Sequence, residues 1–215
     1  MKLFKNIKKW LENQEHLFYL FLLILIVPNI ILCFTEPMPV VAKVCNVLLP
    51  FAFYYLLMTL SRNCGKMFWI LFLFIFFGAF QIVLLYLFGQ SIIAVDMFLN
   101  LVTTNSSEAM ELLDNLVPAL VSVIILYIPA LILAAISIIK KRKLSSEFIR
   151  RERKKAWIAL LIGFISLGAA YGLDKRYELK SDLYPANVCY NVALAFQRNV
   201  QTRTYHRTSE NFTFN

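Results

Sequence analysis

Long apolar stretches separated by short polar segments run along most of this sequence, and they predict its fold. Five of them have about the 17–25 residues that an α-helix needs to cross the hydrocarbon core of a bilayer. They cover residues 17–33, 44–60, 67–87, 116–139 and 156–172. Their apolar residues follow one another without a two-residue alternation, so we expect helices rather than strands. The predicted fold class is an all-α polytopic membrane protein with five transmembrane helices.

Composition supports a membrane protein and excludes some of its functions. Of the 215 residues, 60% are hydrophobic, whereas ordinary soluble domains are about 45–50% apolar. None of the five stretches contains Asp, Glu, Lys, Arg or His. Ion-coupled transporters, proton relays and voltage sensors carry such groups inside the membrane. We therefore do not expect a pump or an exchanger.

Lysine and arginine residues gather on one side of the predicted membrane. With a cytoplasmic N-terminus, 15 of the 22 Lys and Arg residues fall in cytoplasmic segments, nine of them in residues 140–155. The positive-inside rule then predicts a cytoplasmic N-terminus and a C-terminus on the outer side. We interpret the net charge of +9 as an anchor toward anionic membrane lipids rather than a nucleic-acid surface. Residues 1–15 are predicted to form an interfacial amphipathic helix, with a disordered basic tail as the alternative.

The cysteines and the amide residue of the third stretch suggest structural roles. Neither the four cysteines nor the two histidines have the spacing of metal ligands, so we expect no metal site and no catalytic residue in this chain. A disulfide between Cys33 and Cys45 stays open, although small core residues are the favoured interpretation. Gln81 is expected to make an interhelical hydrogen bond.

The segment of residues 96–115, between the third and fourth predicted spans, is amphipathic and contains no basic residue. We expect it to lie as a helix along the periplasmic surface of the membrane. On a continuous helix Asn100, Thr104 and Glu108 fall at i, i+4 and i+8 and share one face. An amide, a hydroxyl and a carboxylate in a row can hold a small cationic headgroup, with Glu108 paired to its ammonium.

Helix capping is the competing interpretation of the same residues. Asn105 followed three residues later by Glu108 matches a capping box, in which Asn105 starts a new helix. Glu108 would then only stabilise the helix N-terminus. The two interpretations can coexist if the break is a slight kink, and the spacing leaves both open.

The run "VDMFLNLVTTNSSEAMELL" resembles the segment after the third helix in bacterial phosphoethanolamine transferases, membrane enzymes that modify lipid A and related surface glycans. Asn100, Thr104 and Glu108 match the Asn, Thr and Glu of that family's outer helix. The family's membrane half has five helices in the same order and a basic stretch before the fifth. The resemblance therefore spans essentially the whole chain, although its sharpest part is only about twenty residues long.

A second run, "LKSDLYPANVCYNVALAFQR", is similar to the outer linker of the same family. Pro185 and Tyr190 fit the family pattern. Tyr184 stands where Asn is expected before that proline, and Val188 where a second proline is common. These departures leave open which acceptor the protein serves.

The resemblance implies a function that needs more than this chain. Residues 1–172 would be a membrane domain in a bacterial inner membrane that binds phosphatidylethanolamine at the outer leaflet through Asn100, Thr104 and Glu108. Residues 173–215 would be a periplasmic linker to a catalytic domain that carries a Thr nucleophile and zinc ligands and transfers phosphoethanolamine to lipid A or a related surface glycan. This sequence shows no such domain, so we expect no cofactor here and no activity by this chain alone.

A non-enzymatic membrane scaffold, or a small subunit of a transporter, is the alternative. It accounts equally well for five spans. It leaves the row of Asn100, Thr104 and Glu108 as a coincidence. An open reading frame that continues into, or adjoins, one for an alkaline-phosphatase-like domain would favour the transferase.

Overall fold

The computed structural model describes residue 6, residues 10–88 and residues 106–210, with the side chains of 6, 10–83, 117–180, 182–198, 200 and 201. Within these ranges the protein is helical and contains no strand. Its elements are α2 (Gln14–Thr35), α3 (Val40–Met58), α4 (Cys64–Ile70), α5 (Phe72–Phe88), α7 (Ser106–Ile139), α8 (Ser146–Leu173), α9 (Leu179–Asp182) and α10 (Ala186–Glu210).

Four helices, α2, α3, α7 and α8, are long and apolar enough to cross a membrane, and the bent pair α4 and α5 makes a fifth if it counts as one span. These helices confirm the predicted all-helical, multi-pass architecture in its coarse form. Helices α2, α7 and α8 extend past the predicted bounds at one end or both, whereas α3 both begins and ends earlier than its predicted stretch. The clearest case is α8, which begins at Ser146, ten residues before the predicted start of its apolar stretch.

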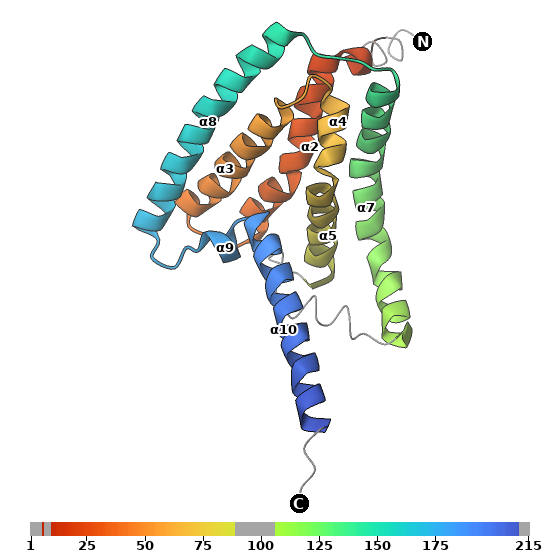
Figure 1. The fold of residues 1–215 in the computed structure, drawn as a ribbon, viewed down its shortest axis with the longest axis vertical. Coiled ribbons are helices and arrows are strands. Elements are labelled where there is room, and N and C mark those ends of the chain that lie inside the picture. Colours follow the sequence, from red (N-terminus) through yellow and green to blue (C-terminus); the bar gives the residue numbers. More distant parts are fainter. Residues whose placement is uncertain (1–5, 7–9, 89–105, 211–215) are drawn as a thin grey trace, which may run out of the picture.

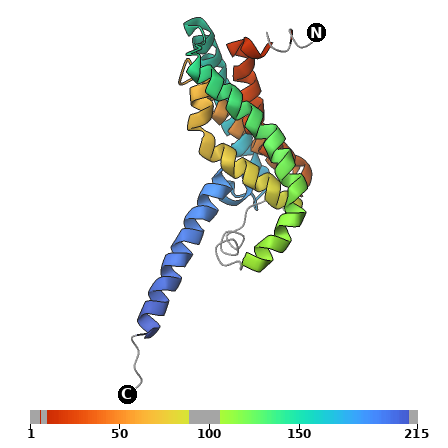
Figure 2. The same ribbon diagram turned by 90° about the vertical axis from the view of Figure 1, so that its right-hand side faces the viewer.

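The helices pack in a layered order that brings distant parts of the chain together. Helix α8 lies against α3, α3 against α2, and both α4 and α5 against α7, so α8 and α7 form opposite edges of the bundle (Figure 1). The start of α2 and the connection from α7 to α8 lie at one end, and α10 projects from the other (Figure 2).

The third predicted span is not one straight helix. Helices α4 and α5 meet at Leu71 with a bend of 61°, and this corrects the prediction of a single helix over residues 67–87. Helical hydrogen bonding continues through the bend, since the Leu71 amide donates to Met67 O and the Ile75 amide donates to Leu71 O. Bends of this kind usually coincide with a proline or a π-bulge. No proline stands in residues 64–88, so nothing local in the sequence marked the bend.

Close packing of α4 against α7 and α2 accounts for the position of the bend. A Cβ atom on Gly65 would lie 2.3 Å from Ala134 O of α7, so α4 approaches the backbone of α7 where only glycine fits. Phe68 is fully buried and stacks on Phe21 of α2, with ring centroids 4.4 Å apart. These contacts place α4 independently of α5.

The fourth predicted span is the C-terminal part of a longer helix, α7. Its apolar part, Val117–Ile139, continues backward without interruption to Ser106. Residues 106–115 of the predicted amphipathic segment therefore belong to α7, and residues 96–105 lie outside the described residues. At 34 residues and ~1.5 Å per residue, α7 is longer than the ~30 Å hydrocarbon core.

Side chains join the connecting segments at the end of the bundle that carries the N-terminus. Arg62 Nε donates to Leu144 O at 2.9 Å, and Asn63 Nδ2 donates to Arg142 O at 2.9 Å. Arg142 Nη1 in turn donates to Glu12 O at 3.3 Å. We call this the basic end, comprising residues 10–14, 59–66 and 140–155. The other end, with the connection from α2 to α3, residues 174–186 and the first turns of α7, is called the opposite end.

Candidate functional site

The predicted headgroup residues lie mostly outside the described part of the chain. Asn100 and Thr104 are not described, and Glu108 lies in the first turn of α7, which begins at Ser106. The start of α7 and the outward course of α10 are at the same, opposite end of the bundle (Figure 1). Whether the three predicted residues share a face stays a prediction. Asn105 lies outside the described residues, so the capping interpretation of Asn105 and Glu108 stays a prediction as well.

Asn46 of α3 joins the segment that follows α8 to the bundle. Its Nδ2 donates to Asp182 O at 2.8 Å, and its Oδ1 accepts from the Tyr177 hydroxyl at 2.9 Å. Asn46 is 1% exposed and Tyr177 is 3% exposed. Burial raises the pKa of the Tyr177 hydroxyl well above its ordinary value. The phenol therefore stays neutral and acts as a hydrogen-bond donor.

Asn29 of α2 and Tyr184 continue these contacts toward α5. Asn29 Nδ2 donates to Asn46 O at 2.9 Å and to Tyr184 O at 2.8 Å. The Tyr184 hydroxyl donates to Phe74 O at 2.6 Å, and burial raises the pKa of that hydroxyl also. We call these five residues the tail network: Asn29, Asn46, Tyr177, Asp182 and Tyr184. They position the start of α10.

Further buried polar groups lie beside the tail network. A Cβ atom on Gly78 of α5 would lie 3.0 Å from the Tyr184 hydroxyl and 3.2 Å from the Tyr127 hydroxyl, so α5, α7 and the tail converge there. Within the described residues, the Tyr127 hydroxyl and both amide atoms of Gln81 are buried without a hydrogen-bond partner. The interhelical hydrogen bond expected of Gln81 is thus not made to any described residue.

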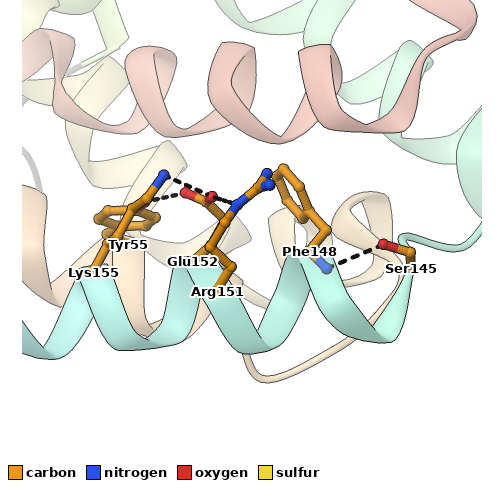
Figure 3. Close-up of polar contacts among 6 residues, drawn as sticks. All are labelled: Tyr55, Ser145, Phe148, Arg151, Glu152 and Lys155. Atoms are coloured by element: carbon orange, nitrogen blue, oxygen red, sulfur yellow. Dashed lines mark hydrogen bonds and ion pairs between the residues drawn. The ribbon is translucent and has the colours of Figure 1, made fainter.

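The basic end contains a buried carboxylate that the sequence analysis did not single out. Glu152 of α8 is fully buried, and Figure 3 shows its carboxylate meeting three donors. The Tyr55 hydroxyl of α3 donates to Oε2. Arg151 Nε and Lys155 Nζ each donate to Oε1 at 2.9 Å. We call Tyr55, Arg151, Glu152 and Lys155 the carboxylate network.

Local sequence places these groups together on α8. Ser145 caps the helix, its hydroxyl accepting from the Phe148 amide at 3.1 Å. From there Phe148, Glu152 and Ala156 recur every four residues on the face that is buried against the bundle. A carboxylate between two buried apolar residues on one helix face was the signal that could have identified Glu152. The lysines and arginines around Glu152 obscure this signal, because residues 140–155 have the composition of a solvated basic segment.

Neither network has the composition of a metal or thiol site. Among the described residues, no three His, Cys, Asp or Glu side chains come together closely enough to hold a metal ion. All four cysteines are free, and Cys33 Sγ donates to Lys43 O at 3.2 Å rather than pairing with Cys45. Both networks instead have a structural role. The tail network fixes residues 177–184 against α2 and α3, and the carboxylate network joins α8 to α3.

Comparisons with known proteins identify no relative of this chain. No family model matches the sequence, and neither the curated proteins nor the solved structures contain a match. The helical bundle and its two polar networks are therefore the basis for a functional proposal.

Proposed function

We propose that this chain is the membrane domain of a phosphoethanolamine transferase in a bacterial inner membrane. In this proposal it binds phosphatidylethanolamine at the outer leaflet, with the opposite end facing the periplasm and the basic end facing the cytoplasm. It supports the transfer of phosphoethanolamine from that lipid to lipid A or a related surface glycan. The family-like run at residues 95–113 is the sequence basis.

One structural observation carries the proposal. The first turn of α7, which contains Glu108, and helix α10 are at the same end of the bundle (Figure 2). A headgroup held near the start of α7 is therefore on the side of the membrane toward which α10 leads. The tail network supports this arrangement because it ties residues 177–184, just before α10, to α2 and α3.

The proposal assigns binding to this chain and chemistry to a catalytic domain. Glu108 pairs with the ethanolammonium, and Asn100 and Thr104 donate or accept hydrogen bonds at the headgroup. In this proposal the zinc ions and the Thr nucleophile implied by the family resemblance belong to the catalytic domain.

Native mass spectrometry of the purified chain with added lipid tests the donor role. We expect phosphatidylethanolamine to bind more tightly than phosphatidylcholine, because a primary ammonium donates three hydrogen bonds and a quaternary one donates none. Glu108→Gln should reduce that preference by up to about fivefold, which is the range of one partly exposed ion pair. Glu111→Gln removes the same charge one turn later and is the matched control.

Two results would contradict the proposal in different ways. Equal binding of both lipids by the unmodified chain would favour the scaffold or transporter-subunit class. A preference for phosphatidylethanolamine that Glu108→Gln leaves intact would retain a lipid-binding domain but remove Glu108 from its site.

A further inference from the structure

We propose that the outward face of α8 is a binding site for one anionic phospholipid, with its phosphate held by Arg150 and Lys154. The site lies at the basic end and is separate from the proposed donor site. Six residues define the face, which runs from the basic end along the apolar part of α8: Arg150, Lys154, Trp157, Leu161, Ile165 and Gly168.

Helical geometry puts these residues in one line. They are spaced four, three, four, four and three residues apart, and such spacings keep side chains on one face of an α-helix. The buried residues Glu152, Ala156, Gly163 and Ala170 occupy the other side. Trp157 is 57% exposed and Leu161 is 63% exposed. No described atom lies within 4 Å of a Cβ built on Gly168.

The carboxylate network divides the cations of α8 into two groups. Arg151 and Lys155 are engaged by Glu152, and Arg153 Nη2 donates to Thr59 O at 2.6 Å. Arg150 and Lys154 are exposed and make no hydrogen bond or ion pair within the part of the chain that the structure describes. They are one turn apart, so both can reach the oxygens of one phosphate.

The order of side chains along the face matches the order of groups in a phospholipid. Cations come first, at the level of the phosphate. Trp157 follows one turn later, and indole rings favour the boundary between headgroup and acyl chain. Leu161 and Ile165 then present apolar surface at acyl-chain depth. Gly168 leaves room for the chain to lie close to the helix backbone.

Charge argues against a second copy of this chain as the occupant. Two copies in one membrane that paired symmetrically through this face would run in parallel and would bring Arg150 and Lys154 of one against the same residues of the other. Like charges at that distance repel. An anionic lipid supplies the opposite charge, and juxtamembrane cations gain ~1 kcal/mol each from an anionic lipid surface.

Fluorescence of Trp157 reports binding at this face directly. The chain contains three tryptophans, so Trp10→Phe and Trp69→Phe leave Trp157 as the single reporter. The protein is reconstituted in phosphatidylcholine vesicles with acyl-brominated phosphatidylglycerol or acyl-brominated phosphatidylcholine, and quenching yields the relative binding constant. We expect phosphatidylglycerol to be favoured about fivefold for each engaged cation.

Two double variants distinguish a specific lipid site from a general attraction of anionic lipids to the basic end. Arg150→Gln with Lys154→Gln should bring the relative binding constant to about one. Lys140→Gln with Lys143→Gln removes the same charge from exposed residues at the same end of the bundle and should leave the preference in place. Raised salt should weaken the preference of the unmodified protein, which checks the ionic contribution without a substitution at the proposed site.

Three results would overturn the site. Equal quenching by the two brominated lipids would show that no anionic lipid is preferred. An equal loss in the two double variants would assign the preference to the overall charge of the basic end. Efficient disulfide cross-linking of a Gly168→Cys variant into a dimer would show that a second copy covers this face.

Discussion

The two ends of the bundle each join separate segments through buried polar groups, but the groups differ in charge. At the basic end, the carboxylate network joins α8 to α3 through a charged acceptor and its donors. At the opposite end, the tail network joins residues 177–184 to α2 and α3 through neutral amides, phenols and backbone carbonyls. One network holds two long helices together, and the other holds a connecting segment against them.

The two networks use different chemistry because their side chains differ in how much they are exposed to water. Arg151 and Lys155 have side chains that are 60% and 54% exposed, so their charges stay hydrated while they neutralise buried Glu152. Asn46 and Tyr177 are almost fully enclosed, and an ion there would lose its hydration without an equivalent partner. Ionic groups therefore suit the rim of the bundle, and neutral hydrogen bonds suit its enclosed part.

The largest expected effect comes from removing the buried charge. Glu152→Gln keeps the shape of the side chain but replaces a charged acceptor of three donors with an amide, and we expect a loss of about 2–3 kcal/mol in the free energy of unfolding. Denaturant unfolding in detergent measures it. Glu147→Gln, on the exposed side of the first turn of α8, is the control and should stay within about 0.5 kcal/mol. An equal effect at both positions would contradict the carboxylate network.

A smaller and more local effect is expected at the opposite end. Asn46→Ala leaves the Tyr177 hydroxyl and Asp182 O without their partner, which corresponds to about 1–2 kcal/mol. Because the Asn46 side chain bonds to the segment before α10 and not to α4 or α7, we expect faster amide exchange in residues 177–184 and unchanged exchange in α4 and α7. Hydrogen exchange with mass spectrometry resolves the two regions. Uniform acceleration across the bundle would show that the tail network supports the whole fold.

The same substitution at both ends sharpens the comparison. Tyr55→Phe removes a donor to a charged carboxylate, and Tyr177→Phe removes a donor to a neutral amide. Hydrogen bonds to charged groups contribute roughly twice as much as neutral ones. We expect Tyr55→Phe to destabilise by about 0.5–1 kcal/mol more than Tyr177→Phe in the same unfolding assay. The opposite order would mean that enclosure matters more than charge.

The smallest expected effect is a gain in stability. Gln81 is buried with neither amide atom paired, so Gln81→Met replaces an unsatisfied amide with an apolar side chain of similar length. We expect an increase of about 0.5 kcal/mol in the free energy of unfolding. A clear loss on Gln81→Met would show that the amide has a partner in the membrane. Thr59→Val, which removes a hydroxyl that donates to Leu56 O at 2.7 Å, should destabilise instead and is the comparison variant.

Much of the fold was predictable because apolar surface alone determines which segments leave water. The stretches at 17–33, 116–139 and 156–172 each lie within a helix long enough to span, and the stretch at 44–60 lies in α3 except for its last two residues. The stretch at 67–87 was recognised as apolar but not as two helices, since the bend at Leu71 depends on contacts of Gly65 and Phe68 with other helices. The continuation of α7 back to Ser106 was likewise open between two interpretations.

The candidate site was less predictable, and the reason is again physical. The spacing of Glu108 with Asn100 and Thr104 predicts a headgroup-binding residue, and this stays a prediction. The buried role of Glu152 is not evident from the sequence, because its partner Tyr55 lies 97 residues away in the chain. Spacing along one helix identifies a face, but it does not say what the face meets.

What the sequence determined by itself is the division of the chain into segments that prefer lipid and segments that prefer water, together with the end of the bundle where positive charge collects. These properties add up residue by residue along the chain, so they need no knowledge of neighbours. The tertiary structure decided which polar side chains are enclosed, where α4 turns into α5, and how the tail is held. Those outcomes depend on pairs of residues far apart in the chain, and only packing brings such pairs within hydrogen-bond distance.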